Sequence, residues 1–321
     1  WAINDGLMVL FFLSVGLEIK RELVTGELSD RRTAALPALA AVAGMVVPAL
    51  VYLATGGARS NTLQGWAIPC ATDIAFAVGV LALAGPRVPQ SLKVFLLALA
   101  IIDDLGAILI IALFYTGGLS AWSLLAAAIC TGILVVFNRQ GVRDVWPYAV
   151  VGLALWLAVL TSGIHATVAG VILAMTIPLT GPAERLSHIL HPWVAFAIVP
   201  MFALANAGVR VVDADAGALL RDPVVLGVVA GLVVGKFLGI SGATAIALRA
   251  GLGRLPDGVT PRDVPAVAAV AGIGFTVSLF IAELAFPEGF GADAARVGIL
   301  LASLLAGLVG AALLRRVPVR G

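Results

Sequence analysis

Charged side chains are scarce in this chain. Only 12% of its 321 residues are Asp, Glu, Lys or Arg, whereas 61% are hydrophobic and the mean hydropathy is +1.09. A soluble domain carries about 25% charged residues, so an ordinary soluble globular protein is excluded. The two cysteines, Cys70 and Cys130, both lie in apolar runs, which excludes a disulfide framework and a cysteine-rich metal site.

The chain also lacks a strong excess of charge of either sign. Its formal net charge of +2 is too small to mark a nucleic-acid surface. The partner that this composition implies is the lipid bilayer, and no nucleic acid or cofactor is expected.

Long uncharged apolar stretches are what the sequence has in abundance. Strand-like alternation is absent and Leu, Ala, Val and Gly dominate, so the fold class predicted is an all-α polytopic membrane protein. We predict about eleven transmembrane helices, over residues 4–20, 33–53, 66–85, 91–116, 120–137, 146–161, 164–180, 192–209, 224–248, 264–285 and 294–314.

Most of the basic residues lie in the connecting segments on one side of these spans. Of the 20 Lys and Arg residues, 15 fall on one side, four (Arg59, Arg210, Arg221 and Arg296) fall on the other, and Lys236 lies within a span. Basic loops face the cytoplasm, so the carboxyl terminus is expected there.

Four ionisable residues lie within spans: Asp73, Asp103, Asp104 and Lys236. Asp103 and Lys236 each lie about 18 Å along their helices, near the middle of about 30 Å of hydrocarbon. Together the four cost on the order of 10 to 14 kcal/mol to insert, and such residues usually mark ion or proton pathways.

Asp103 and Asp104 are adjacent in the sequence. On a helix they point about 100° apart, so one can face a cavity while the other faces a neighbouring helix. A carboxylate can hold either a proton or a hard cation, so the pair is chemically suited to exchange one for the other.

Two spans contain signals for an interrupted helix. Pro69 lies four residues before Asp73, an acid that can balance exposed helix amino ends, and Gly272 lies in an Ala-Gly-Ile-Gly segment.

The Gly231–Phe237 segment resembles a phosphate-binding loop, but it has one residue too few between its glycines, and it has Phe in place of Ser or Thr. Lys236 therefore needs a carboxylate partner, for which the intramembrane aspartates are the candidates.

Several motifs together resemble the NhaA-type sodium/proton antiporters. They are GLEIKREL (16–23), ATDIAFAVGVLAL (71–83), ALAIIDDLGAILIIALFYT (98–116), SGIHATVAGV (162–171), HPWVAFAIVPMFALANAGV (191–209), VGKFLGIS (234–241) and AGIGFTVSLFIAELAF (271–286).

The resemblance implies inverted repeats over 33–116 and 224–314, with two interrupted helices that cross. The corresponding division is a first helix and cytoplasmic mouth (1–32), core repeat one (33–116), linking and interface helices (117–223) and core repeat two (224–321). It implies a secondary transporter, not an enzyme, that exchanges cytoplasmic Na⁺ or Li⁺ for external protons by alternating access, with electrogenic and pH-regulated transport, in the bacterial inner membrane.

By the same resemblance, site roles pass to matching residues of this chain. Asp104 and Asp103 would bind Na⁺ and protons with Thr72 nearby. Asp73 and Lys236 would compensate charge: Asp73 would balance helix amino ends, and Lys236 would pair with Asp103 or balance helix carboxyl ends. The pH-responsive residues would be Glu18, Arg21, Glu22, His188 and His191.

The chain departs from the family pattern at two places. Ser187 stands where the family has an acidic residue, so a shifted or weaker pH response is expected. The family's further helix and dimer-forming hairpin lie upstream of residue 1, so a homodimer would depend on segments outside this chain.

Three other functions use similar features. An intramembrane aspartyl protease would pair aspartates from adjacent spans. Its GxGD motif is absent, and the adjacent Asp103 and Asp104 cannot face each other, which leaves Asp73 with Asp103 as the candidate pair. A cation channel or an organic-anion symporter would also use broken helices.

Overall fold

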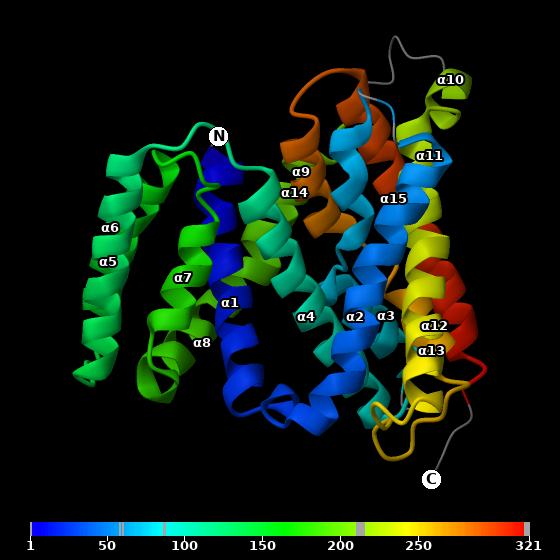
Figure 1. Cartoon of the computed structure of the whole chain (residues 1–321), viewed down its shortest axis with the longest axis horizontal. Coiled ribbons are helices and arrows are strands. Elements are labelled where there is room, and N and C mark those ends of the chain that lie inside the picture. The colour runs from blue at the N-terminus through cyan, green and yellow to red at the C-terminus, as the bar shows by residue number, and fades with distance from the viewer. Residues whose placement is uncertain (1, 58, 60, 86–87, 210–215, 318–321) are drawn as a thin grey trace. The chain divides into compact units, whose positions relative to one another are not determined.

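The computed structural model describes residues 2–57, 59, 61–85, 88–209 and 216–317. Within these residues the regular elements are all helices, which confirms the predicted all-α class (Figure 1). Arg87, Arg210 and Arg320, counted above for orientation, lie outside the described residues.

The helices fall into two compact units, which are described separately. One unit comprises residues 1–26 and 108–205, and the other comprises residues 27–107 and 206–321. Residues 33–107 and 224–314 of the two predicted repeats lie in the second unit.

The first unit contains α1 and the helices of the middle of the chain. Its helices are α1 (Met8–Val24), α5 (Ala121–Arg139), α6 (Val145–Leu160), α7 (Val168–Thr176), α8 (Glu184–Trp193) and α9 (Val199–Asn206), the last of which ends at the boundary between the units. Small residues allow α1 and α7 to pack closely, since a Cβ at Gly16 would lie 2.7 Å from that of Ala174.

The second unit repeats an order of elements: an unbroken span, a broken span and an unbroken span. The first series is α2 (Arg31–Tyr52), a 3-10 helix (Leu63–Cys70) followed by α3 (Ile74–Leu83), and α4 (Gln90–Phe114), which continues into the first unit. The second series follows α10 (Ala216–Leu220). Its first span is continuous and consists of α11 (Pro223–Val229), a π-helix (Ala230–Gly235) and α12 (Lys236–Arg249). Its broken span is α13 (Val264–Val270) with α14 (Phe275–Ala285), and its last span is α15 (Phe290–Leu314).

Seven helical stretches in the described residues are long and apolar enough to cross a membrane, or eight if the bent pair α13 and α14 forms one span. All eleven predicted spans overlap helices, and eight of them match these eight stretches. The other three correspond to α1, α6 and α7, which have 17, 16 and 9 residues, so the count of eleven stays a prediction.

Glycines bring α12 and the π-helix before it (Ala230–Gly235) against α2, and α12 and α2 run side by side (Figure 1). Gly231, Gly235 and Gly239 recur every fourth residue and so share one helix face. A Cβ at Gly235 would lie 2.7 Å from Pro48 Cα, and one at Gly239 would lie 2.5 Å from the Ala43 carbonyl oxygen. The segment that resembles a phosphate loop is therefore a close-packing surface, and it fixes the position of Lys236.

Candidate ion-binding site at the crossing of two broken helices

Both predicted helix interruptions are present. The helix that contains Pro69 ends at Cys70, and α3 begins at Ile74 after three non-helical residues. α13 ends at Val270 and α14 begins at Phe275, with a bend of 47° between them. Each break frees backbone N–H and C=O groups at the middle of an apolar unit, where they need partners.

The two breaks satisfy each other's polar groups. The Asp73 amide donates to the Ile273 carbonyl at 2.7 Å, and the Thr72 hydroxyl donates to the Ala271 carbonyl at 2.9 Å. The rings of Phe76 and Phe275 meet edge to face, with centroids 4.8 Å apart. The interrupted helices therefore meet at their non-helical segments, as the predicted crossing requires.

Asp73 caps two helices with one carboxylate. Its side chain accepts from the Phe76 amide of α3 at 3.1 Å, and from the Thr276 amide at 2.9 Å and hydroxyl at 2.5 Å in α14. Both amides lie at helix amino ends, where a negative charge is favoured. Asp73 is 2% exposed, so these hydrogen bonds replace its hydration.

We expect Asp73→Ala to lower the stability of the protein by about 1 to 3 kcal/mol, because the amides of Phe76 and Thr276 lose their acceptor. Thr276→Val is the matched control, since it removes one hydroxyl but leaves both amides capped by Asp73. Thermal unfolding in detergent should therefore give a larger drop for Asp73→Ala than for Thr276→Val. Equal melting temperatures for the two variants would contradict the capping role.

Lys236 has the carboxylate partner that its burial demands. Its ammonium group forms a buried ion pair with Asp103 and donates to the Thr72 hydroxyl at 2.7 Å. The side chains of Lys236 and Asp103 are both fully buried. Thr72 links this pair to the helix breaks, because its hydroxyl accepts from Lys236 and donates to Ala271.

The two adjacent aspartates are both buried, and the structure gives Asp103 a charged partner. The Oδ2 atom of Asp103 contacts Lys236, and its buried Oδ1 atom has no hydrogen-bond partner among the residues that the structure describes. Asp104 is also buried, with 5% exposure, at the next position of α4. The Asp103 Oδ1 atom, a buried carboxylate oxygen without a donor in the described part of the chain, is suited to take a proton or a cation.

A cavity of about 1220 Å³ opens at one end of the second unit. It is lined by residues from α2, α4, the end of α12 and the following loop, among them Pro37, Ala98, Leu248 and Asp257. Ala98 precedes Asp103 by five residues, so the cavity wall comes to about 8 Å from Asp103 along the axis of α4.

The predicted pH-responsive residues lie in the first unit. Glu18, Arg21 and Glu22 occupy the last turns of α1, which packs against α8, where Ser187, His188 and His191 lie. The charges of Arg21, Glu22 and His191 all act on Glu18. Both histidines are exposed, and His188 lies one turn before His191.

A polar group that the sequence analysis missed also lies in the first unit. His165 Nε2 lies 3.7 Å from Asp5 Oδ1, and its Nδ1 atom lies 3.0 Å from the Thr167 hydroxyl. The SGIHATVAGV stretch contains His165, but no local pattern links it to Asp5, 160 positions away. Thr276 was missed for the same reason, although the GIGFT stretch contains it.

Comparison with known proteins gives the same family as the motifs. Residues 1–314 match the sequence model of the family described as Na⁺/H⁺ antiporter 1. The chain is 55% identical over 98% of its length to a protein of Rhodospirillum rubrum named Na(+)/H(+) antiporter NhaA, of which the match covers 82%. It is 54% identical, with the same two coverages, to the protein of that name in Escherichia coli O1:K1 / APEC.

The fold and the buried charges define a polytopic membrane transporter. This chain belongs to the Na⁺/H⁺ antiporter 1 family. It is a transporter and not an enzyme. The geometry also disfavours the protease alternative, because the Asp73 carboxylate caps two helices and Asp103 is paired with Lys236.

Proposed function

We propose that this chain exchanges Na⁺ for protons across the bacterial inner membrane, with Asp104 and Asp103 as the shared site for the two cations. The observation that carries the proposal is the buried Asp103–Lys236 pair, directly beside Asp104 and hydrogen-bonded through Thr72 to the crossing of two broken helices. The relatives' names support the identity of the ions.

The same carboxylates serve both ions by competition. Na⁺ is a hard cation that prefers oxygen ligands, and it competes with protons for a carboxylate. If Na⁺ binding releases two protons, from both aspartates or from one aspartate and Lys236, the exchange moves one net positive charge in each cycle. Lithium shares the ligand preference of sodium, so it is expected to be carried as well.

Asp73 and Lys236 balance charge in this scheme. Asp73 offsets the partial positive charges of two helix amino ends, whichever ion is bound. Lys236 offsets Asp103 when that carboxylate is ionised. Alternating access would then expose the site to one side at a time, as in other transporters with interrupted helices.

Proteoliposomes test both the exchange and its electrical balance. An imposed pH gradient should drive ²²Na⁺ flux, and an inside-negative potential set by valinomycin and potassium should accelerate exchange by protein oriented with its cytoplasmic side inward. The potential contributes about 2.3 kcal/mol per net charge per 100 mV. A rate indifferent to the potential would mean one proton per sodium, and no flux under a pH gradient would refute exchange itself.

We further propose that the α1–α8 cluster adjusts transport to pH. Histidine changes charge near neutral pH, and His191 lies on α8, which packs against the helix that carries Glu18. A His188→Ala, His191→Ala double variant should move the pH profile of exchange by about half a pH unit or more, as expected when a partly exposed charge pair is lost. Ile189→Ala on the same exposed helix is the control. A pH profile equal to that of the parent would contradict a role of His188 and His191 in the pH response, and would leave them only a structural role in a helix at the membrane interface.

A further inference from the structure

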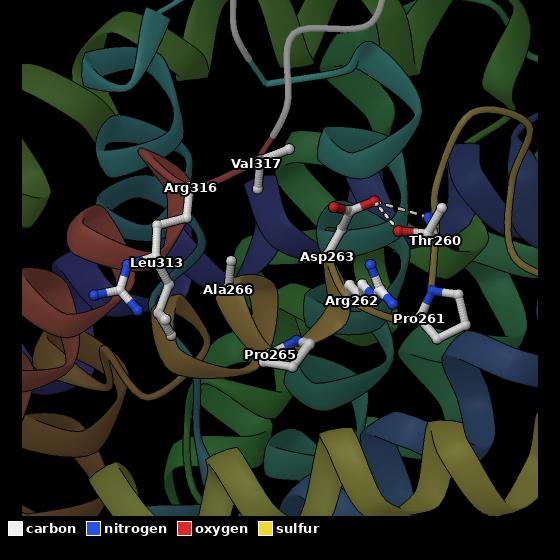
Figure 2. Close-up of a pocket in the computed structure, with 9 residues that line it drawn as sticks. All are labelled: Thr260, Pro261, Arg262, Asp263, Pro265, Ala266, Leu313, Arg316 and Val317. Carbon is white, nitrogen blue, oxygen red and sulfur yellow. Dashed lines mark hydrogen bonds between the residues drawn. The ribbon is translucent and has the colours of Figure 1, made fainter.

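A second cavity, of about 640 Å³, lies at one end of the second unit, where α13 begins and α15 ends. Its walls are partly apolar, from Pro261, Pro265, Ala266 and Leu313, and it is also lined by two basic residues, Arg262 and Arg316. Figure 2 shows Arg316 and Leu313 on one side, Arg262 and Pro261 on the other, and Ala266 and Pro265 between them.

The two arginines have no acidic partner in the part of the chain that the structure describes. The side-chain ion pairs found there involve His165, Lys236 and Arg296. The carboxylate in the cavity wall, Asp263, accepts from the Thr260 amide and hydroxyl, both at 2.8 Å (Figure 2). The cavity therefore combines partly apolar walls with two exposed arginines that form no ion pair among the described residues.

The position of Arg316 matches the depth of lipid headgroups. α15 has 25 residues and is about 38 Å long, somewhat more than about 30 Å of hydrocarbon, and Arg316 lies two residues beyond its end. Leu301, Leu305 and Leu308 are exposed on α15 at helical spacing, and this stripe continues to Arg315 and Arg316. A lipid with its acyl chains along the stripe would bring its phosphate to the cavity.

We propose that this cavity binds the headgroup of an anionic phospholipid, with Arg262 and Arg316 attracting its negative charge from opposite sides. Guanidinium groups suit phosphate because their donors form paired hydrogen bonds with its oxygens. The apolar walls receive the glycerol backbone and the first acyl carbons, which inorganic phosphate does not have. The site is independent of the transported ions, since it involves neither the aspartates nor Lys236.

The test is lipid retention by the purified full chain in a neutral detergent, measured by native mass spectrometry during titration with phosphatidylglycerol. Each basic residue near an anionic lipid strengthens binding about fivefold, so the Arg262→Gln, Arg316→Gln variant should bind about 25-fold more weakly. The matched control, Arg185→Gln, Arg249→Gln, removes two exposed arginines that line neither cavity and should bind as the parent does.

A second variant separates the cavity from its charge. Leu313→Trp fills the cavity but keeps both arginines, so in protein that melts at the parent temperature it should also weaken phosphatidylglycerol binding. Phosphatidylcholine should be retained less than phosphatidylglycerol, and millimolar inorganic phosphate should not displace the lipid. Parent-like binding by either test variant, equal retention of phosphatidylcholine, or displacement by phosphate would overturn the proposal.

Discussion

Replacing Asp104 with asparagine is expected to abolish sodium binding and exchange. Asp104 is buried in α4 beside the Asp103–Lys236 pair, and its ionised form supplies the charge that holds a cation there. A unit charge 4 Å away contributes about 4 kcal/mol at an effective dielectric constant of 20. Loss of that attraction should weaken Na⁺ affinity at least about 100-fold, because 1.4 kcal/mol corresponds to a tenfold change.

Asparagine keeps nearly the same shape, so the variant should fold normally and lose only the charge and the exchangeable proton. Isothermal calorimetry with NaCl measures binding directly, and ²²Na⁺ flux in proteoliposomes measures exchange. Glu283→Gln is a matched control, since it also neutralises an acid of the second unit, one that contacts Arg296. Sodium-dependent heat that survived in Asp104→Asn would refute the assignment of Asp104.

Asp103→Asn should also impair exchange, for a different reason. Here the neutral amide would leave Lys236 without its carboxylate partner while Asp104 kept its charge. If two protons leave for each sodium, this variant should change the electrical response of exchange as well as its rate. Normal transport by Asp103→Asn would assign the second proton elsewhere.

The sequence predicted the broken helices because their causes are local. Pro69 and the glycines around Gly272 locally disfavour a continuous helix, and the structure has both breaks within four residues of them. The length of a helix is less local. Residues 164–180 read as one apolar span, but α7 occupies only Val168–Thr176, since Gly163 adopts a positive φ and Pro178 follows the helix end.

The choice of partners could not be predicted in the same way. A buried lysine needs a carboxylate, so the residues alone left Asp73, Asp103 and Asp104 as candidate partners of Lys236, and only the family resemblance indicated Asp103. Adjacent residues differ by about 100° around α4, and only its packing within the unit determines that Asp103 contacts Lys236. Likewise, Thr276 reaches Asp73 across 203 positions of sequence.

Removing one member of the Asp103–Lys236 pair should destabilise the protein far more than removing both. Lys236→Met leaves the Asp103 carboxylate fully buried without its cation, and breaking a buried pair in this way costs about 3 to 5 kcal/mol. Replacing both partners with neutral groups of similar volume is often close to neutral. The double variant Asp103→Asn, Lys236→Met should therefore recover much of the stability that Lys236→Met loses.

Thermal unfolding in one detergent at one pH measures all four proteins of this double-mutant cycle. For a chain of this size, a loss of 3 to 5 kcal/mol should lower the melting temperature on the order of 10 °C. The melting temperature of Asp103→Asn alone should lie between those of the parent and of Lys236→Met, because Lys236 keeps its hydrogen bond to the Thr72 hydroxyl. If the effects of the two single substitutions simply added in the double variant, the residues would not be coupled, and the ion pair would not be what stabilises Lys236 at the crossing.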